Sequence, residues 1–260
     1  MIEQLFNIDL KKISNSSEKE ALDRKENLKL FFANGLPNKK EENWKFTDFN
    51  KIISKNFKNI KNNDLIPDPK VELINDFEHN YIVLVNGSFA SSNMKFEEKD
   101  KVKIKKFNSF EEIKYQSVNN LNYLNKALSL GGFNLEIEEN YKCKKPIIIY
   151  NYFTSNLDNK IINNSNKIRL NKNSELNLIE YNVCEKSKFI KNTFEKIEIE
   201  REALLKNIVV QKTKCDGYFY KNISGSQGYN SSYQSFILSS GLKFNKIEID
   251  MNLNKENCNC

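Results

Sequence analysis

The sequence has little of what most enzymes and metal centres need. Its 260 residues include one histidine, His79, although histidine supplies most general bases and many metal ligands. The eight glycines are scattered, and residues 225–228 lack the lysine and the strand–helix context of a phosphate-binding loop. A Gly-x-Ser-x-Gly nucleophile elbow is also missing. These shortages argue against a self-sufficient enzyme.

Long apolar runs are missing as well. No stretch has the uninterrupted apolar length of a membrane-spanning helix, and the mean hydropathy is -0.65. Residues 1–6 carry an acid where an export signal would carry basic residues, and no apolar run follows them. The sequence therefore predicts a cytoplasmic protein without a membrane partner.

Cysteine is present, but it forms no recognisable framework. The cysteines are odd in number and widely spaced, which predicts no disulfide scaffold. Only Cys258 and Cys260 lie close in the chain, and zinc or an iron–sulfur cluster normally takes four ligands. We interpret these two as incidental thiols. The others, expected to be small core or near-surface residues, are Cys143, Cys184 and Cys215.

The charge excess is mild, because 41 lysines and arginines face 34 acids and give a net charge of +7. It consists mostly of lysine spread among asparagine and glutamate, as in residues 101–106 and 142–145. A nucleic-acid-binding protein would gather its basic residues on one stripe with aromatic residues between them. We therefore expect no nucleic-acid partner.

The first third of the chain has helical patterns. Ser17 and Glu20 have the spacing of a capping box, and an apolar stripe runs on to Phe32 before Gly35 ends the helix. A second, shorter helix is predicted to begin at Thr47 or Asp48. Residues 62–70 contain two prolines and are predicted to form a linker. We expect an N-terminal helical region over residues 1–66.

The pattern then becomes mixed and finally almost wholly β. Residues 81–85 predict a strand, and Asn86-Gly87 predicts a tight turn after it. Residues 110–130 return to a helical or mixed pattern, so residues 67–131 are expected to be a mixed α/β connection. Residues 132–260 are expected to be the β core. Its predicted strands lie at 133–137, 146–153, 166–170, 175–181, 193–199, 204–211, 217–223, 232–238 and 242–253.

Short strands at even spacing are compatible with a sandwich, a barrel or a β-solenoid. Few tight hairpin turns occur after Gly132, where Asp216-Gly217 is the one such pair. Loosely recurring phrases of strand, polar corner and strand also favour a solenoid, in which each coil covers the next.

Two single residues have competing interpretations. His79 lies in a polar stretch just before a strand, which favours a solvated surface histidine over a catalytic one. Trp44 is the only tryptophan, and we interpret it as a packing anchor between the helical and β parts. The alternative is an aromatic hot spot for a partner protein.

Residues 35–49, GLPNKKEENWKFTDF, resemble the N-terminal signature of SufD proteins, which are subunits of the SUF iron–sulfur cluster assembly scaffold. The matching positions are Gly35, Leu36, Pro37, Glu42, Trp44, Lys45, Phe46 and Thr47. Residues 85–89, 124–128, 145–147 and 241–249 are similar to later family segments in the same order.

The resemblance implies N-terminal helices, a right-handed parallel β-helix core, a SufB-like partner and a SufC-like ATPase that hydrolyses the nucleotide. By the family pattern the sequence stops in mid-solenoid, so we expect a C-terminally truncated fragment, or else a shortened relative. The ATPase-docking region and its histidine have no counterpart here. No catalytic, cofactor-binding or metal residue is therefore carried over, and the matching positions are expected to be structural.

The resemblance thus implies a non-catalytic scaffold subunit of the SUF complex. The complex as a whole handles the iron–sulfur cluster, and no cofactor is assigned to this chain. A generic protein-interaction module is the first alternative. A polysaccharide-active β-helix enzyme is the second, but it needs clustered carboxylates on one face, and the β region offers mostly lysine, asparagine and isolated glutamate.

Overall fold

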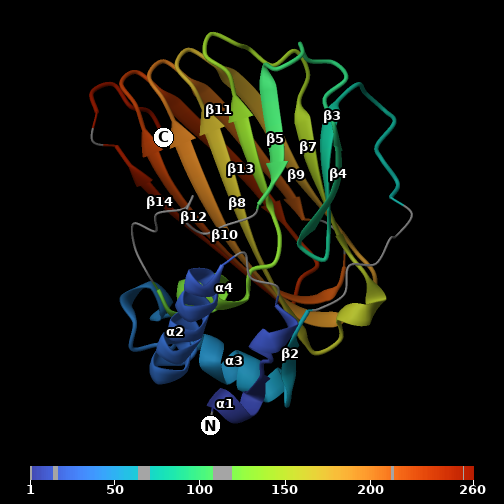
Figure 1. Ribbon diagram of the computed structural model, residues 1–260, viewed down its shortest axis with the longest axis vertical. Coiled ribbons are helices and arrows are strands. Elements are labelled where there is room, and N and C mark those ends of the chain that lie inside the picture. Colours follow the sequence, from blue (N-terminus) through green and yellow to red (C-terminus); the bar gives the residue numbers. More distant parts are fainter. Residues whose placement is uncertain (1, 14–16, 64–70, 108–118, 212–213, 254) are drawn as a thin grey trace.

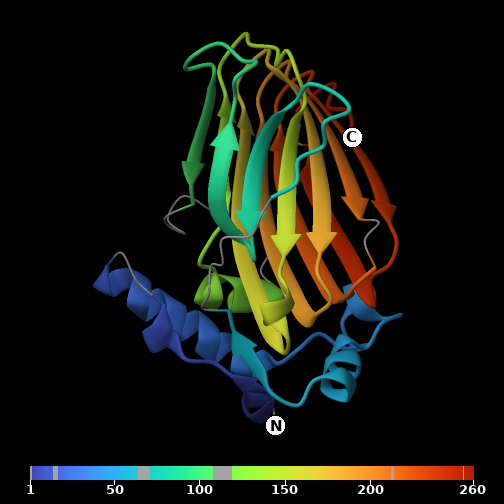
Figure 2. The same cartoon turned by 90° about the vertical axis from the view of Figure 1, so that its right-hand side faces the viewer.

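The chain folds into two facing β-sheets with helices along one side (Figure 1). The computed structural model describes residues 2–13, 17–63, 71–107, 119–211, 214–253 and 255–260. Figure 2, turned by a quarter turn, shows the two sheets face to face and the helices beneath the ends of their strands.

Within these residues one sheet has eight strands and the other has six. The eight-stranded sheet runs in the order β1-β2-β8-β10-β12-β14, and β6 and β5 continue it beside β8. Its strands are β1 (Phe6–Asn7), β2 (Ile60–Asn62), β5 (Val102–Lys106), β6 (Phe133–Ile137), β8 (Lys160–Leu170), β10 (Lys188–Ile199), β12 (Asp216–Gln227) and β14 (Phe244–Asn252).

The six-stranded sheet has the order β13-β11-β9-β7-β3-β4. Its strands are β3 (Asn80–Val85), β4 (Ser88–Asn93), β7 (Ile147–Phe153), β9 (Glu175–Cys184), β11 (Leu204–Gln211) and β13 (Ser232–Ser239).

From β7 onward the chain alternates between the two sheets, and each strand pairs in parallel with the strand one coil earlier. Asn192 of β10, for example, lies beside Asn163 of β8, 29 residues away. This is a parallel β-solenoid, so the predicted solenoid is confirmed. Parallel pairing of strands that are joined through the opposite sheet excludes the sandwich and barrel alternatives.

Asparagine shapes one corner of the coils. Asn140, Asn173 and Asn230 have positive φ angles of 61°, 55° and 54°. Asparagine tolerates this left-handed conformation better than most residues. The Asn173 N–H donates to Arg201 O at 2.9 Å, and the Asn140 N–H donates to Lys172 O at the same distance. The asparagine-rich separators of the sequence therefore turn the chain and bind the next coil.

Two strands of the eight-stranded sheet begin well before their predicted starts, whereas β12 begins at Asp216, one residue before the predicted 217. β8 and β10 begin at Lys160 and Lys188, six and five residues before the predicted positions 166 and 193. Their first halves are buried on both faces, between the other sheet and the helices. Because both faces are buried, the sequence there shows no alternation of apolar and polar residues.

The tight turn at Asn86-Gly87 joins β3 to β4 in an antiparallel hairpin, as predicted. Both residues have positive φ angles, 48° and 83°, which are typical of a type I′ turn. A Cβ atom on Gly87 would lie 2.6 Å from Cγ2 of Ile162, so this position also allows β8 to approach closely.

Four α-helices cover one side of the described solenoid: α1 (Ile2–Leu5), α2 (Glu18–Asn34), α3 (Phe49–Asn56) and α4 (Asn120–Leu128). The Ser17 side chain caps α2 by accepting from the N–H of Glu20, and Gly35 ends this helix with a φ angle of 76°. Asp48 caps α3 in the same way through Lys51. Both predicted helix starts are confirmed.

The helices share a core with the solenoid. Phe31, Trp44 and Leu124 pack in one cluster with Ile161 and Ile190 of the eight-stranded sheet. Asparagine side chains of α4 also bind this sheet, since Asn125 Nδ2 donates to the carbonyls of Asn164 and Asn192 at 3.0 and 2.9 Å.

Three short or edge strands were not predicted from the sequence. β1 and β2 pair in parallel, and β2 continues the pairing to β8. β5 lies antiparallel to β6. Two-residue and three-residue strands are too short to show a period, and the lysines of β5 hide its alternation. Most of the predicted linker, and residues 110–118 of the predicted mixed segment, lie outside the described residues.

Candidate functional site: charges and thiols inside the solenoid

Three zones follow one another along the strands in the interior between the sheets. One end is aliphatic, with Ile168, Leu176 and Ile197 in a single cluster. The other end holds aromatic rings and thiols, including Phe153 and Cys215. Between these two ends lies a zone of buried charges, which we call the charged zone. It consists of Glu180, Lys191, Glu195 and Lys221.

The charged zone connects the two sheets. Glu180 comes from β9, and the ammonium groups of Lys221 and Lys191 lie 2.7 and 3.2 Å from its two carboxylate oxygens. Lys221 also lies 3.0 Å from a carboxylate oxygen of Glu195. All four side chains are 1–8% exposed. Every ammonium group of this zone therefore faces a carboxylate from another strand.

Asparagines of the preceding coils complete the charged zone. Asn151 Nδ2 donates to Glu180 at 3.0 Å, and Asn166 Nδ2 donates to Glu195 at 3.2 Å. Hydrogen bonds to the charged form are needed here, because a buried charge is costly unless it is both paired and hydrogen-bonded.

The pairing keeps Glu180 and Lys221 in their charged forms. Burial alone would raise the pKa of Glu180, but Lys221 and Lys191 outweigh it and hold the pKa below its ordinary value of 4.5. Burial would likewise lower the pKa of Lys221, but Glu180 and Glu195 raise it above 10.5. A general acid or base needs a pKa near the working pH, so this arrangement holds charge in place and does not exchange protons near neutrality.

The thiol end adjoins the charged zone through Lys191. Its Nζ atom lies 5.2 Å from the ring centroid of Phe153 and 5.3 Å from that of Phe219. Two thiols belong to this end: Cys215, just before β12, lies in the aromatic cluster, and Cys184, at the end of β9, packs against it. The interaction with Cys184 lowers the pKa of Cys215 despite its burial, whereas the interaction with Cys215 and burial raise the pKa of Cys184.

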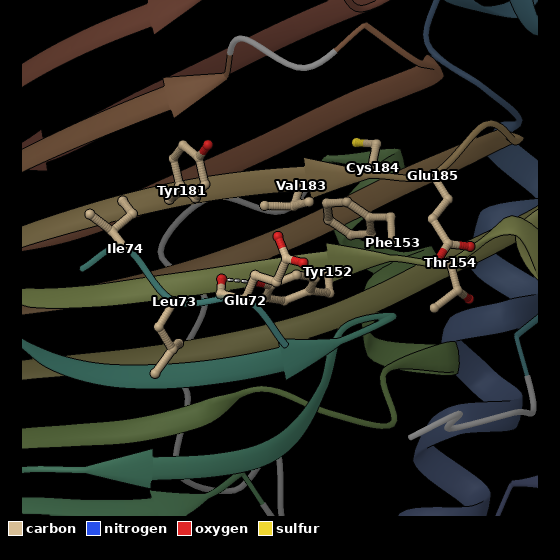
Figure 3. Close-up of a pocket in the computed structure, with 10 residues that line it drawn as sticks. All are labelled: Glu72, Leu73, Ile74, Tyr152, Phe153, Thr154, Tyr181, Val183, Cys184 and Glu185. Atoms are coloured by element: carbon tan, nitrogen blue, oxygen red, sulfur yellow. Dashed lines mark hydrogen bonds between the residues drawn. The ribbon is translucent and has the colours of Figure 1, made fainter. Parts of the chain in front are cut away.

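A cavity of about 390 Å³ opens beside Cys184 (Figure 3). Residues 72–74 form one wall, and the ends of β7 and β9 form the other. The Tyr152 hydroxyl donates to the carbonyl of Glu72 and so fixes the two walls together. The lining residues are Glu72, Leu73, Ile74, Tyr152, Phe153, Thr154, Tyr181, Val183, Cys184 and Glu185.

His79 is buried, so the expectation of a solvated surface histidine is wrong. It is 8% exposed, with Nδ1 2.9 Å from Phe77 O and Nε2 2.9 Å from the Tyr150 hydroxyl. A carbonyl only accepts, so Nδ1 carries the proton and Nε2 accepts from Tyr150. The Ile74 N–H donates to the same hydroxyl at 3.0 Å. The polar sequence around His79 did not reveal that residues 71–79 fold over the outer face of the six-stranded sheet.

Comparison with protein families agrees with this architecture. A model described as the SUF system FeS cluster assembly, SufBD core domain, matches residues 152–260. A second model, described as the SufBD protein N-terminal region, matches residues 2–149. The chain belongs to the SufB/SufD family. Membership places it in the SUF system of iron–sulfur cluster assembly. No curated protein matches the chain.

In this SufB/SufD-family protein, the signature-like segment of residues 35–49 leads from α2 to α3. Leu36 and Pro37 are buried, and Pro37 O accepts from the N–H of Asn50 at 2.9 Å. Glu42 and Lys45 form an exposed ion pair at 2.7 Å. Thr47 donates its N–H to Trp44 O, also at 2.7 Å.

Trp44 lies between the helical part and the solenoid. It is 2% exposed, and its ring lies 5.7 Å from that of Tyr220 in β12 and 6.4 Å from that of Phe244 in β14. Lys246 covers the indole at 4.7 Å and donates to Asn43 O at 2.8 Å. The packing interpretation predicts such a location, whereas Phe46, two residues on, is 86% exposed.

The two cysteines predicted to be incidental differ in exposure. Cys258 is half-buried with its thiol 3.2 Å from Gly228 O, and Cys260 is exposed. In the described part of the chain, no three His, Cys, Asp or Glu side chains gather as they would around a metal ion. None of the described helices is long and apolar enough to cross a membrane.

The charged zone and the thiol pair were not predicted from the sequence. Each of their residues appears there as an isolated charge or cysteine within a strand-like run. The available signal was the alternation of β9, in which Leu176, Leu178 and Glu180 share one face. A glutamate on an otherwise apolar face indicates a buried, paired carboxylate.

Proposed function

We propose that the chain is a SufD-type scaffold subunit of the SUF complex, without catalytic activity of its own. It would act in the cytoplasm with a SufB-like subunit and a SufC-like ATPase, and the iron–sulfur cluster would be the cargo of the whole complex. Nucleotide hydrolysis would belong to the ATPase.

The observation that carries this proposal is the placement of the segment that resembles the SufD signature. Residues 35–49 connect α2 to α3, and Trp44 fixes them against β12 and β14. The segment thus sets the position of the N-terminal helices on the solenoid, and it presents Lys45 and Phe46 to the outside. Such a rigid helix–solenoid unit is what a scaffold subunit needs to hold its partners at fixed positions.

The charged zone supports a non-catalytic role. Its carboxylates and ammonium groups are paired with one another across the two sheets, and the pairing shifts the pKa values of Glu180 and Lys221 away from neutrality. Paired, buried charges give directional contacts between coils and so favour one register of the solenoid.

The test is co-expression of the full chain with the SufB-like and SufC-like proteins of the same source. We expect a tagged chain to co-purify with the SufB-like subunit in a 1:1 ratio, measured by size exclusion with light scattering. The chain alone should hydrolyse no ATP. Pairing with a SufD-like protein instead would make this chain a SufB-type subunit and would contradict the proposal.

Trp44→Ala separates packing from partner binding. Truncating a buried Trp costs roughly 3–5 kcal/mol, so we expect a lower midpoint of urea unfolding. The matched control is Phe46→Ala, because Phe46 is aromatic but exposed, and it should leave the midpoint unchanged. If Trp44→Ala kept the stability of the natural chain and lost only the partner, Trp44 would be a binding hot spot instead.

A further inference from the structure

The outer face of the six-stranded sheet is covered over one half only. Residues 71–79, which we call the strap, pack on the strands β3 and β7. Beneath the strap, Ile148 and Tyr150 are 0% exposed. On the same face of β11 and β13, by contrast, Ile208 and Phe236 are 37% and 62% exposed.

The open half continues the apolar rows of the covered half. Parallel pairing places one residue of each strand side by side in a row across the sheet. One row leads from Ile148 to Phe236 and the next leads from Tyr150 to Leu238, and both are apolar or aromatic throughout. Exposed apolar rows that continue a buried contact are typical of an interaction surface. We call their uncovered part the open face, and it consists of Ile179, Tyr181, Ile208, Val210, Phe236 and Leu238.

The strap shows what kind of segment this sheet binds. Its Ile74 N–H donates to the Tyr150 hydroxyl at 3.0 Å, and its Glu78 carboxylate lies 2.8 Å from the ammonium group of Lys145, just before β7. The strap therefore runs antiparallel to β7. It buries aliphatic side chains, bonds its backbone to a tyrosine hydroxyl and places an acid at a lysine near its C-terminal end.

The open face offers a second tyrosine hydroxyl in the same row. The ring of Tyr181 lies 6.0 Å from that of Tyr150, its register partner on β7. Within the described residues, the Tyr181 hydroxyl has no hydrogen-bond partner. Tyr181 and residues 72–74 line the same cavity of about 390 Å³ (Figure 3), so space remains beside the strap for a second segment.

A second lysine also lies in the matching position. Lys206 of β11 is exposed on the same face as Ile208. Residue 206 is in register with residue 177, and residue 178 with residue 147, so Lys206 lies at the level of residue 146, next to that of Lys145. In the part of the chain that the structure describes, Lys206 has no carboxylate partner. The open face thus repeats the groups that hold the strap.

We propose that the open face binds an extended segment of a partner protein, which lies beside the strap and runs antiparallel to β11. Apolar side chains of this segment cover Ile208 and Phe236, its backbone bonds to the Tyr181 hydroxyl, and a carboxylate near its C-terminal end pairs with Lys206. Extended peptides are commonly recognised through alternate side chains together with backbone hydrogen bonds. This interaction does not require the chain to be of the SufD type.

A synthetic peptide tests the interaction. The probe has the sequence of residues 71–78, VELINDFE, because this sequence already fits the neighbouring half of the sheet. It carries fluorescein at its N-terminus and an amide at its C-terminus. The probe is titrated with the full chain, and its fluorescence anisotropy is measured. We expect saturable binding at chain concentrations up to about 1 mM.

Variants of exposed residues locate the bound probe. Phe236→Ser and Ile208→Ser should each weaken binding by at least about tenfold, since a few apolar anchors dominate such contacts. Tyr181→Phe should weaken binding about two- to tenfold through the loss of one hydrogen bond. The matched control is Leu22→Ser, because Leu22 is 67% exposed but lies on α2, and it should leave binding unchanged.

A charge exchange tests the direction of the segment. Lys206→Glu should weaken binding of the natural probe roughly fivefold, as expected for an exposed ion pair. A probe with Glu78→Lys should recover this loss on the Lys206→Glu chain. A probe with Glu72→Lys should not recover it, because Glu72 lies at the other end of the segment.

Three results would overturn the proposal. The first is the absence of saturable binding to the natural chain. The second is binding that Phe236→Ser and Ile208→Ser leave unchanged, or that Leu22→Ser weakens equally. The third is a natural chain that light scattering shows to be a dimer and that Phe236→Ser makes monomeric, since a second copy would then cover the open face. Failure to pair with a SufB-like subunit would contradict only the proposed function, because the probe is measured on the chain alone.

Discussion

The aliphatic end and the charged zone lie side by side between the same two sheets, and they hold the coils together in different ways. At the aliphatic end, Ile168, Ile197 and Ile223 of successive coils are 0% exposed and belong to one apolar cluster without directional bonds. In the charged zone, Glu180 and Lys221 are buried nearly as deeply, but each depends on named partners at 2.7–3.2 Å.

The difference shows which part of the interior stabilises the fold and which part restricts the register of the coils. Apolar contacts tolerate a change of neighbour, because burial of area and not direction sets their free energy. A buried ion pair gains little net free energy, but removal of one partner leaves a desolvated charge. The charged zone therefore opposes a shift of register that the aliphatic end alone would permit.

The largest effect is expected when the charged zone loses its central carboxylate. Glu180→Ala removes the shared partner of Lys191 and Lys221, and we expect a loss of roughly 3–5 kcal/mol in the free energy of unfolding, measured by urea titration. The control is Glu175→Ala on the same strand, whose ion pair with Lys142 is exposed and is expected to contribute about 0–1 kcal/mol. Equal losses of stability in Glu180→Ala and Glu175→Ala would contradict the expected difference between the buried and the exposed ion pairs.

The aliphatic end is tested by Ile197→Ala. Truncation of this fully buried side chain should cost about 2–5 kcal/mol through lost burial and a residual cavity. Ile208→Ala on β11 is the control, because Ile208 is 37% exposed and should cost far less. Ile197→Ala should leave a single cooperative transition, whereas two transitions would show that the aliphatic end, and not the charged zone, sets the register.

The pH dependence of Glu180 gives a third comparison. Its pKa is lower in the folded chain than in the unfolded chain, so its contribution is present above about pH 4.5 and is lost as pH falls toward the folded pKa. The advantage of the natural chain over Glu180→Gln should therefore be constant from pH 6 to 9 and shrink below about pH 4.5, by up to roughly 1.4 kcal/mol per pH unit.

For Lys221 the contribution to stability is expected to be lost at high pH, whereas that of Glu180 is lost at low pH. Its pKa is raised in the folded chain, so its contribution is complete below its ordinary value of 10.5 and is lost only at higher pH. Urea titrations of the natural chain and of Glu180→Gln between pH 3 and 9 measure the difference in their free energies of unfolding. If the stability advantage of the natural chain over Glu180→Gln changed steadily across neutral pH, Glu180 and Lys221 would not both stay charged there.

The smallest effect is expected for the asparagines that complete the charged zone. Asn151→Ala removes one donor to Glu180 and should cost about 1–3 kcal/mol, because the lost bond is to a buried charge. Asn177→Ala, at an exposed position of β9, should stay within about 0.5 kcal/mol of the natural chain. A neutral result for Asn151→Ala would limit the charged zone to its four ionic residues.

Features that depend on residues close together in the sequence could be predicted, and those that depend on distant residues could not. The Ser17 cap, the Asp48 cap and the Asn86-Gly87 turn were predicted correctly, because each depends on residues within a few positions of one another. The alternation in β9 and β11 was equally visible, since one face is apolar. The first halves of β8 and β10 were missed because burial on both faces leaves no period.

By itself the sequence determined the helix ends, the hairpin, the faces of the alternating strands and the family. The tertiary structure decided that His79 is buried against Tyr150, that Glu180 is paired with Lys191 and Lys221, and that Cys184 packs against the aromatic cluster of Cys215. The physical reason is register. Each of these contacts joins coils, sheets or a covering segment that are far apart in the chain, so the position of the partner is fixed only when the solenoid is wound.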